Sequence, residues 1–148
     1  MKKLLALCLI TISCAKDVDD LGFRTYIIPE GEHRSGNFFN HPVNSRINFK
    51  FILDESAEYT TEIAENQYDV NKIYGFSDFG KAHQKYSIRL GWRYVEGNVE
   101  LCWLKRENSS MSSDGFWGAI RRYYLYPYFG GNEFAPHDIT IKIKEWKD

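Results

Sequence analysis

The stretch KYSIRLGWRYVEGNVELCW, residues 85–103, decides the fold class because its side chains alternate between apolar and polar. A period of two residues predicts a β-strand whose two faces differ. The turn residues Glu96, Gly97 and Asn98 then separate this strand from a second one, which predicts a hairpin. The polar face is either an ordinary solvated face or the floor of a groove that holds an anionic ligand. The apolar face carries Tyr86, Ile88, Leu90, Trp92 and Tyr94, and the polar face carries Ser87, Arg89, Gly91 and Arg93.

The same alternation recurs along most of the chain. It predicts further strands at residues 23–28, 47–54, 119–127 and 139–146. No window of a dozen residues has a helical period, and residues 62–70 predict one helical turn at most. We expect loops at residues 31–45, 75–83, 107–118 and 130–137. Strands with one apolar and one polar face, joined by turns, predict an all-β fold, an antiparallel β-sandwich in a single domain of residues 23–148.

The first fourteen residues, MKKLLALCLITISC, are typical of a cleaved leader rather than of a folded segment. Two lysines precede an apolar run that is too short to cross a bilayer as a helix. The run ends in small residues and Cys14, and this end resembles the lipobox of bacterial lipoproteins, in which the cysteine carries the lipid. The position three before the cysteine is usually Leu and is Thr11 in this chain. We therefore expect a signal peptide at residues 1–14 and lipidation of Cys14, with a plain secretory signal as the alternative.

Residues 15–22 begin AKDVDD and are expected to form a tether between the lipid and the domain. A lysine followed by acidic residues after the lipid cysteine resembles the export tag of some surface lipoproteins, whereas the alternative is a solvated linker. This arrangement predicts a protein of the bacterial outer membrane, held there through its lipid alone. The export tag, if it acts, places it on the cell surface.

Composition excludes several classes of function. The chain has 148 residues and a formal net charge of −1, so no basic excess indicates nucleic acid. Aromatic residues make up 16%, which suits strands and sugar-facing surfaces. By phase we expect Trp92 and Trp103 in the core, and Cys102 as a buried, unreactive thiol. No spacing of His, Cys and carboxylates predicts a metal site, and no cofactor motif is present.

Three segments in this order resemble the jelly-roll, concanavalin-like polysaccharide lyases of the alginate and glucuronan lyase type. The resemblance covers about half of the chain after the leader, and it implies a jelly roll from which some strands are missing. In that family a lysine and a Ser-x-Arg pair contact a uronate polymer, and two tyrosines on the returning strand act as base and acid. The matching segments are NKIYGFSD at residues 71–78, YSIRLGWRYVEGNVEL at 86–101 and YFGGNEFAPHDITIKI at 128–143.

Carried over by position, the resemblance implies that Lys72, Ser87 and Arg89 are the catalytic groove residues and bind the ligand. Arg93 and Tyr74 are further candidates for ligand contact. Gly91 lies on the same predicted face, where the absence of a side chain is expected to leave room for a sugar ring. The returning strand departs from the family, because Cys102 and Leu104 stand where the family has its tyrosines.

These residues lead to one main hypothesis and two alternatives. The main hypothesis is a lipid-anchored protein outside the cytoplasm that binds a poly- or oligosaccharide, uronate polymers among them, with weak or no lyase activity. The first alternative is an active lyase that cleaves uronate polymers by β-elimination and uses another residue, such as Tyr74, Tyr86 or His83. The second alternative is a structural or adaptor lipoprotein of a surface complex without a sugar site.

Overall fold

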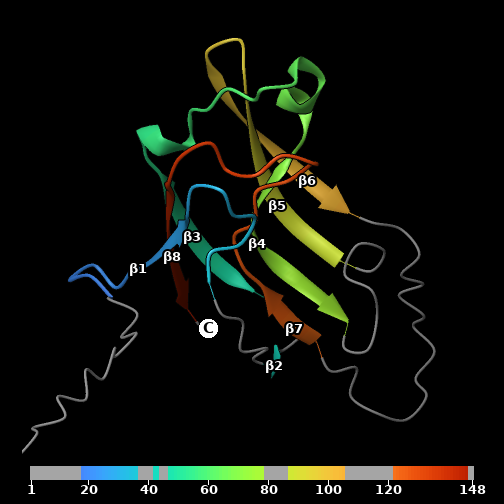
Figure 1. Cartoon of the computed structure of the whole chain (residues 1–148). Helices are drawn as coiled ribbons and strands as arrows, with labels where there is room; N and C mark the ends of the chain where they lie inside the picture. The colour runs from blue at the N-terminus through green and yellow to red at the C-terminus, as the bar shows by residue number, and fades with distance from the viewer. Residues whose placement is uncertain (1–17, 37–41, 44–46, 79–86, 106–121, 147–148) are drawn as a thin grey trace, which may run out of the picture.

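A computed structural model describes residues 18–36, 42–43, 47–78, 87–105 and 122–146, and it shows two antiparallel sheets packed together (Figure 1). The smaller sheet has the order β1-β8-β3 and the larger sheet the order β2-β7-β4-β5-β6. The predicted all-β sandwich is therefore confirmed. The strands are β1 (Arg24–Ile28), β2 (Pro42–Val43), β3 (Asn48–Leu53), β4 (Asn71–Asp78), β5 (Ser87–Val95), β6 (Asn98–Lys105), β7 (Arg122–Leu125) and β8 (Ile139–Trp146). Two 3₁₀ turns, η1 (Glu55–Ala57) and η2 (Ala64–Tyr68), lie between β3 and β4, and η2 matches the single helical turn predicted at residues 62–70.

The β5–β6 hairpin follows the prediction from its sequence. Val95 pairs with Asn98, so Glu96 and Gly97 form a two-residue turn. Both turn residues have positive φ, 52° at Glu96 and 77° at Gly97. This conformation matches the twist of two antiparallel strands and favours glycine at the second position.

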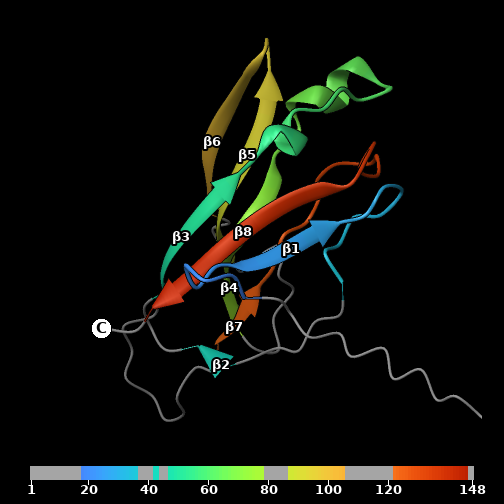
Figure 2. The ribbon, with the colours of Figure 1, turned by 90° about the vertical axis from the view of Figure 1, so that its left-hand side faces the viewer.

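The core lies between the two sheets, which face each other in Figure 2. Trp92 is fully buried, as predicted, and its Nε1 donates to the carbonyl of Ala57 in η1. Trp103 was also expected in the core, and that expectation is wrong, because 71% of it is exposed. Both residues point to the side of the smaller sheet, but β6 extends beyond the strands that cover β4 and β5. The main apolar side chains of the core are Tyr26, Ile28, Tyr74, Leu90, Trp92, Tyr126, Ile139, Ile141 and Ile143.

Residues 75–78 were expected in a loop, and they are instead the second half of β4. This half is paired on both sides, with β5 and with β7, so long-range pairing outweighs the weak strand propensity of Gly75 and Ser77. The register shifts between Lys72 and Tyr74, where Ile73 forms a β-bulge. The bulge turns both Ile73 and Tyr74 into the core.

Gly91 has a different role from the one expected. A Cβ at this position would collide with the carbonyl oxygen of Asn71 and with a methyl group of Val70. The space is therefore occupied by β4 and its preceding residue, and it is not open to a ligand. Gly75 has the same role from the other strand, since its Cβ would collide with the carbonyl oxygen of Ile88. Both glycines allow β4 and β5 to approach each other closely beside the bulge.

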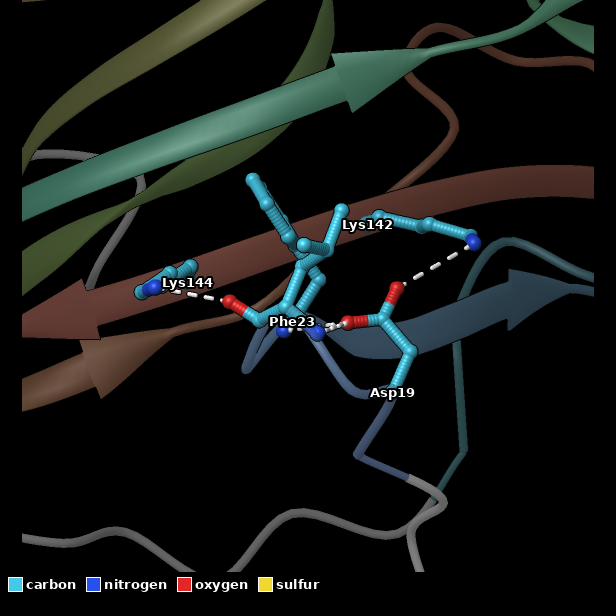
Figure 3. A network of polar contacts seen from close by, with 5 residues as sticks. Asp19, Phe23, Lys142 and Lys144 are labelled. Carbon is cyan, nitrogen blue, oxygen red and sulfur yellow. Dashed lines mark hydrogen bonds and ion pairs between the residues drawn. The ribbon is translucent and has the colours of Figure 1, made fainter.

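The start of the described chain is bound to the smaller sheet (Figure 3). Asp19 accepts hydrogen bonds from the backbone amides of Leu21 and Phe23 and forms an ion pair with Lys142 on β8. Lys144 donates to the carbonyl of Leu21 at 2.7 Å. Residues 19–22, expected to belong to the tether, are thus part of the folded domain.

Several expectations fall outside the described residues. They concern the leader with Cys14, the acidic tag up to residue 17, the loop at 107–118, and the side chains of His83 and Tyr86. Within the described part of the chain, no helix has the length and apolar character needed to cross a membrane. The same part contains no group of three His, Cys, Asp or Glu side chains arranged to hold a metal ion.

Candidate functional site

The larger sheet has a second face, which points away from the smaller sheet, and we call it the outer face. Leu90 and Trp92 point into the core, so the alternate residues Ser87, Arg89, Gly91 and Arg93 of β5 lie on the outer face. Residues that pair directly across strands share a face, so the register extends this assignment. The pairs with β4, β6 and β7 add Lys72, Gly75, Ser77, Glu100, Cys102, Leu104, Tyr123 and Leu125.

One row of this face carries two cations and a tyrosine. Gly91 pairs with Lys72, Lys72 forms a bridge with Tyr128, and Tyr128 forms a bridge with Arg34. The Nζ of Lys72 lies 5.5 Å from the centre of the Tyr128 ring, a cation–π contact. Arg34 and Tyr128 were not among the predicted site residues. In the sequence, the only signal for these residues was the YFGG segment at residues 128–131, which belongs to the same resemblance as Lys72. Local patterns gave no other signal, because residues 34, 72 and 128 pair across long distances in the sequence.

The next row contains Arg89, between Gly75 on β4 and Leu104 on β6. Arg89 is 8% exposed and Ser87 is 7% exposed, and Ser87 pairs with the buried Ser77. Arg89 therefore does not point into bulk water. A buried guanidinium is costly unless hydrogen bonds or a counter-charge compensate it. A cation held in such a shielded place interacts more strongly with an anion than one in water does.

Arg93 lies at the far end of the same strand and forms a salt bridge with Glu100 on β6. Its Nε lies 2.7 Å from Oε2 of Glu100, and both side chains are partly exposed. The hydrogen bond to Glu100 raises the pKa of Arg93. The charge of Arg93 is thus offset by a carboxylate on the same face.

Tyr74, a predicted ligand contact, does not lie with these residues. The bulge at Ile73 directs it to the opposite side of the sheet, where it has no exposed surface. Its ring packs against Phe49, Tyr124 and Tyr126, and its hydroxyl donates to Glu145 on β8 at 2.6 Å. Burial and this hydrogen bond raise the pKa of Tyr74 far above its usual range. We therefore remove Tyr74 from the candidate site.

The two positions that depart from the lyase pattern also lie on the outer face. Cys102 pairs with Gly91 and Leu104 pairs with Arg89, so each stands directly beside the predicted groove residues. Cys102 is partly exposed and not fully buried as expected. Neither side chain can act as a phenolic acid or base. Among the described residues, the tyrosines on this face are Tyr123 and Tyr128.

His33 borders the site and was not predicted. Its ring stacks on Tyr128, with 5.2 Å between ring centres and an interplanar angle of 4°, and it also contacts Phe134. Nδ1 lies 2.9 Å from the carbonyl oxygen of Phe129, so Nδ1 carries the proton and donates. In the neutral ring the acceptor is then Nε2.

Among the described residues, the outer face thus combines Arg34, Lys72, Arg89 and Arg93 with one acid and two tyrosines. Such a surface suits a polymer that bears carboxylates and presents sugar rings for stacking. No family model, no curated protein and no solved structure matches this chain.

Proposed function

We propose that the protein binds an acidic poly- or oligosaccharide, of the uronate-containing class, on the outer face of the larger sheet. The observation that supports this most is the register that places Arg34, Lys72 and Arg89 on one face, with Tyr128 between the first two. Carboxylates of a polymer pair with the cations, and the apolar side of a sugar ring packs on the phenol ring.

The charge balance of this face supports an anionic ligand over a neutral one. Among its described side chains, Arg34, Lys72, Arg89 and Arg93 are basic and Glu100 alone is acidic. The chain as a whole is nearly neutral, at −1. The outer face is therefore more basic than the chain as a whole.

The likeness to jelly-roll lyases supports the same ligand class, and a jelly-roll connection of the strands is part of this proposal. We propose binding with weak or no elimination, because Cys102 and Leu104 flank Gly91 and Arg89 where the family has phenols. Tyr123 and Tyr128 share the face with Arg89, and they are the residues that an active lyase would have to use. An adaptor without a sugar site remains the third candidate.

The test is binding of purified polymannuronate and polyglucuronate, with a neutral glucan as the reference. Arg89→Ala and Lys72→Ala are expected to weaken uronate binding about tenfold each, equivalent to about 1.4 kcal/mol. Lys50→Ala is the matched control, because Lys50 is an exposed cation on the outward side of the smaller sheet. If Lys50→Ala weakens binding as much as Arg89→Ala does, binding depends on net charge alone, and the proposed site is contradicted.

Two further readouts separate the alternatives. Release of the unsaturated uronate product, detected by its ultraviolet absorbance and abolished by Tyr123→Phe or Tyr128→Phe, would establish an active lyase. An unchanged melting temperature of Arg89→Ala together with lost binding indicates a ligand-binding arginine. If no uronate polymer binds to the wild type, the adaptor is favoured.

The proposed location is the bacterial outer membrane, with a lipid on Cys14 as the anchor and the acidic tag as a surface-export signal. The sequence of the leader supports this part of the proposal.

A further inference from the structure

The side of the smaller sheet that points away from the core carries three lysines, and we call it the lysine face. It faces the reader in Figure 2. Ile139, Ile141 and Ile143 of β8 are buried in the core, so the alternate residues of β8 point outward. Residues that pair with them on β1 and β3 share this face. The lysine face therefore consists of Thr25, Ile27, Asn48, Lys50, Ile52, Thr140, Lys142, Lys144 and Trp146.

Two of the lysines stand directly opposite each other, because Lys50 of β3 pairs with Lys144 of β8. Like charges at directly paired positions destabilise a sheet. Lys144 donates to the carbonyl of Leu21, and Nζ of Lys50 lies 5.8 Å from the centre of the Trp146 ring. Neither lysine forms an ion pair with a residue that the structure describes. Two adjacent positive charges on this face thus have no carboxylate partner in the described part of the domain.

The third lysine contributes less to the charge of the face. Lys142 forms an ion pair with Asp19, whose Oδ2 lies 3.4 Å from Nζ, so these two charges offset each other. Asp20 is exposed beside Asp19 and forms no ion pair with the described lysines. An anion outside the chain would therefore meet Lys50 and Lys144, at the end of the sheet where Trp146 lies.

Exposed apolar side chains surround these charges. Ile27, Ile52 and Trp146 are 46%, 44% and 41% exposed. Ile27 and Ile52 lie on the two edge strands, β1 and β3, whereas the lysines of β8 lie between them. Protein–protein interfaces have the opposite arrangement, with an apolar centre and a charged rim. Lysine stems, tryptophan and scattered aliphatic side chains are instead typical of a surface at the boundary between lipid and water.

The N-terminal segment lies on the same face, because Asp19 and Leu21 bind Lys142 and Lys144. Cys14, the residue proposed to carry the lipid, is five residues before Asp19. A lipid on Cys14 would therefore enter the bilayer close to the lysine face. The charge and the exposed apolar residues of the face do not depend on that lipid.

We propose that the lysine face binds the surface of an anionic lipid bilayer. Lys50 and Lys144 pair with phosphate groups of the lipid headgroups, and these phosphates supply the counter-charge that the chain does not provide. Trp146 lies among the headgroups, where its ring and its indole N–H are both accommodated. Ile27 and Ile52 contact the boundary of the acyl chains. An acylated protein is held more firmly when a basic surface adds a second contact with the membrane.

The experiment measures flotation with vesicles, using residues 15–148, which retain every described residue and carry no lipid. We expect binding to vesicles of phosphatidylcholine mixed with phosphatidylglycerol, no binding to phosphatidylcholine alone, and weaker binding at high salt. Lys50→Glu and Lys144→Glu are each expected to weaken binding about tenfold or more. Trp146→Ala is expected to weaken it about threefold or more. Lys72→Glu is the matched control, because it makes the same charge change on the opposite side of the sandwich, and vesicle binding is expected to be unchanged.

Stability of the same variants separates lost binding from lost folding. Lys50→Glu places a carboxylate opposite Lys144, so its melting temperature is expected to equal or exceed that of the wild type. A lower melting temperature together with weaker binding of this variant would contradict the proposed role of Lys50.

The proposal is overturned if the wild type does not bind anionic vesicles, or if Lys72→Glu weakens binding as much as Lys50→Glu does. Two further probes identify a different ligand. Inorganic phosphate that shifts the amide signals of β3 and β8, without vesicle binding, would indicate a site for a free anion. Polyglutamate that binds where vesicles do not would indicate an acidic protein partner.

Uronate binding of the variants is measured in parallel, because the proposed sugar site lies on the other sheet. Lys72→Glu is expected to weaken uronate binding and keep vesicle binding, whereas Lys50→Glu is expected to do the reverse. Failure of the vesicle test therefore leaves the sugar site untouched, and failure of the uronate test leaves the lysine face untouched.

Discussion

The hydroxyl oxygen of Tyr74 on β4 lies 2.6 Å from Oε1 of Glu145 on β8, so a hydrogen bond to a carboxylate joins the two sheets. The phenol is completely buried among Phe49, Tyr124 and Tyr126, whereas Glu145 is exposed. Burial raises the pKa of Tyr74 first, and the bond to Glu145 raises it further. Burial also raises the pKa of Tyr26, to about 12, and that of Tyr126. The contact between the sheets is thus a cluster of neutral phenols.

Tyr74→Phe is expected to lower the free energy of unfolding at neutral pH by about 1 kcal/mol, because Glu145 can replace the lost bond with water. The effect on pH dependence is more specific. The unfolded tyrosine ionises above about pH 10, whereas the folded one stays neutral, so stability is present below pH 10 and is lost as the pH rises. The variant is expected to lose stability less steeply above pH 10, by up to about 1.4 kcal/mol per pH unit. Urea titrations between pH 7 and 11 measure this, and parallel curves for the two proteins would contradict it.

The two tryptophans of the hairpin form a matched pair for testing the extent of the core. Trp92 has no exposed surface and donates a hydrogen bond to Ala57, whereas Trp103 is 71% exposed. Trp92→Phe is expected to cost about 2–3 kcal/mol of stability, through the cavity and the lost bond. Trp103→Phe is expected to change stability by less than about 0.5 kcal/mol. Similar losses for both variants, measured by urea denaturation, would mean that the smaller sheet covers β6 as well.

Gly91→Ala tests why this position lacks a side chain. The added methyl group would collide with the backbone of Asn71, which cannot move without disturbing β4. We expect a loss of about 2 kcal/mol or more in thermal or chemical denaturation. A stable variant that has lost uronate binding would instead restore the earlier expectation that Gly91 leaves room for a sugar.

Asp19→Asn tests the attachment of the N-terminal segment to β8. The backbone hydrogen bond from Phe23 lowers the pKa of Asp19 most, and the bond to Lys142 lowers it too. A depressed carboxyl pKa stabilises the fold above the unfolded value and loses that contribution as the pH falls through the folded value. The melting temperature of the variant should therefore lie below that of the wild type at pH 7, and the gap should close in acid. Asp20→Asn, at the adjacent exposed acid, is the control, and an equal effect there would rule out the specific network.

Cys14→Ser tests the proposed anchor. Cells that express the full chain are expected to incorporate radiolabelled palmitate into the wild type and none into the variant, and the variant should leave the membrane fraction. An unlabelled wild type that is still cut near residue 14 would favour a plain secretory signal.

Side-chain alternation predicted the inward residues of β3 and β8 correctly, and Leu90 and Trp92 of β5, because a period of two is fixed by strand geometry. The same rule failed at Trp103, since alternation gives the side to which a residue points and not how far the opposing sheet reaches. It also failed at residues 75–78. There Gly75 and Ser77 have weak strand propensity, and pairing with β5 and β7 holds them in the sheet.

The candidate site was predictable only in part. Ser87 and Arg89 follow from alternation within one strand, and Lys72 joins them through its pairing with Gly91. Tyr74, predicted as a ligand contact, points into the core instead, because a bulge in β4 changes the phase of the strand there and leaves no mark in the sequence. Arg34 and Tyr128 reach the face through bridges between distant segments, which local patterns do not encode.

The attachment of Asp19 and Leu21 to Lys142 and Lys144 has a consequence for orientation if Cys14 carries a lipid. The chain enters the domain on the outward side of the three-stranded sheet, and the four residues from Cys14 to Val18 can span at most about 14 Å. So short a connection would hold the outward side of the three-stranded sheet, which bears Lys142 and Lys144, against the lipid headgroups. The outer face of the five-stranded sheet would then point away from the membrane and be accessible to a polysaccharide in solution.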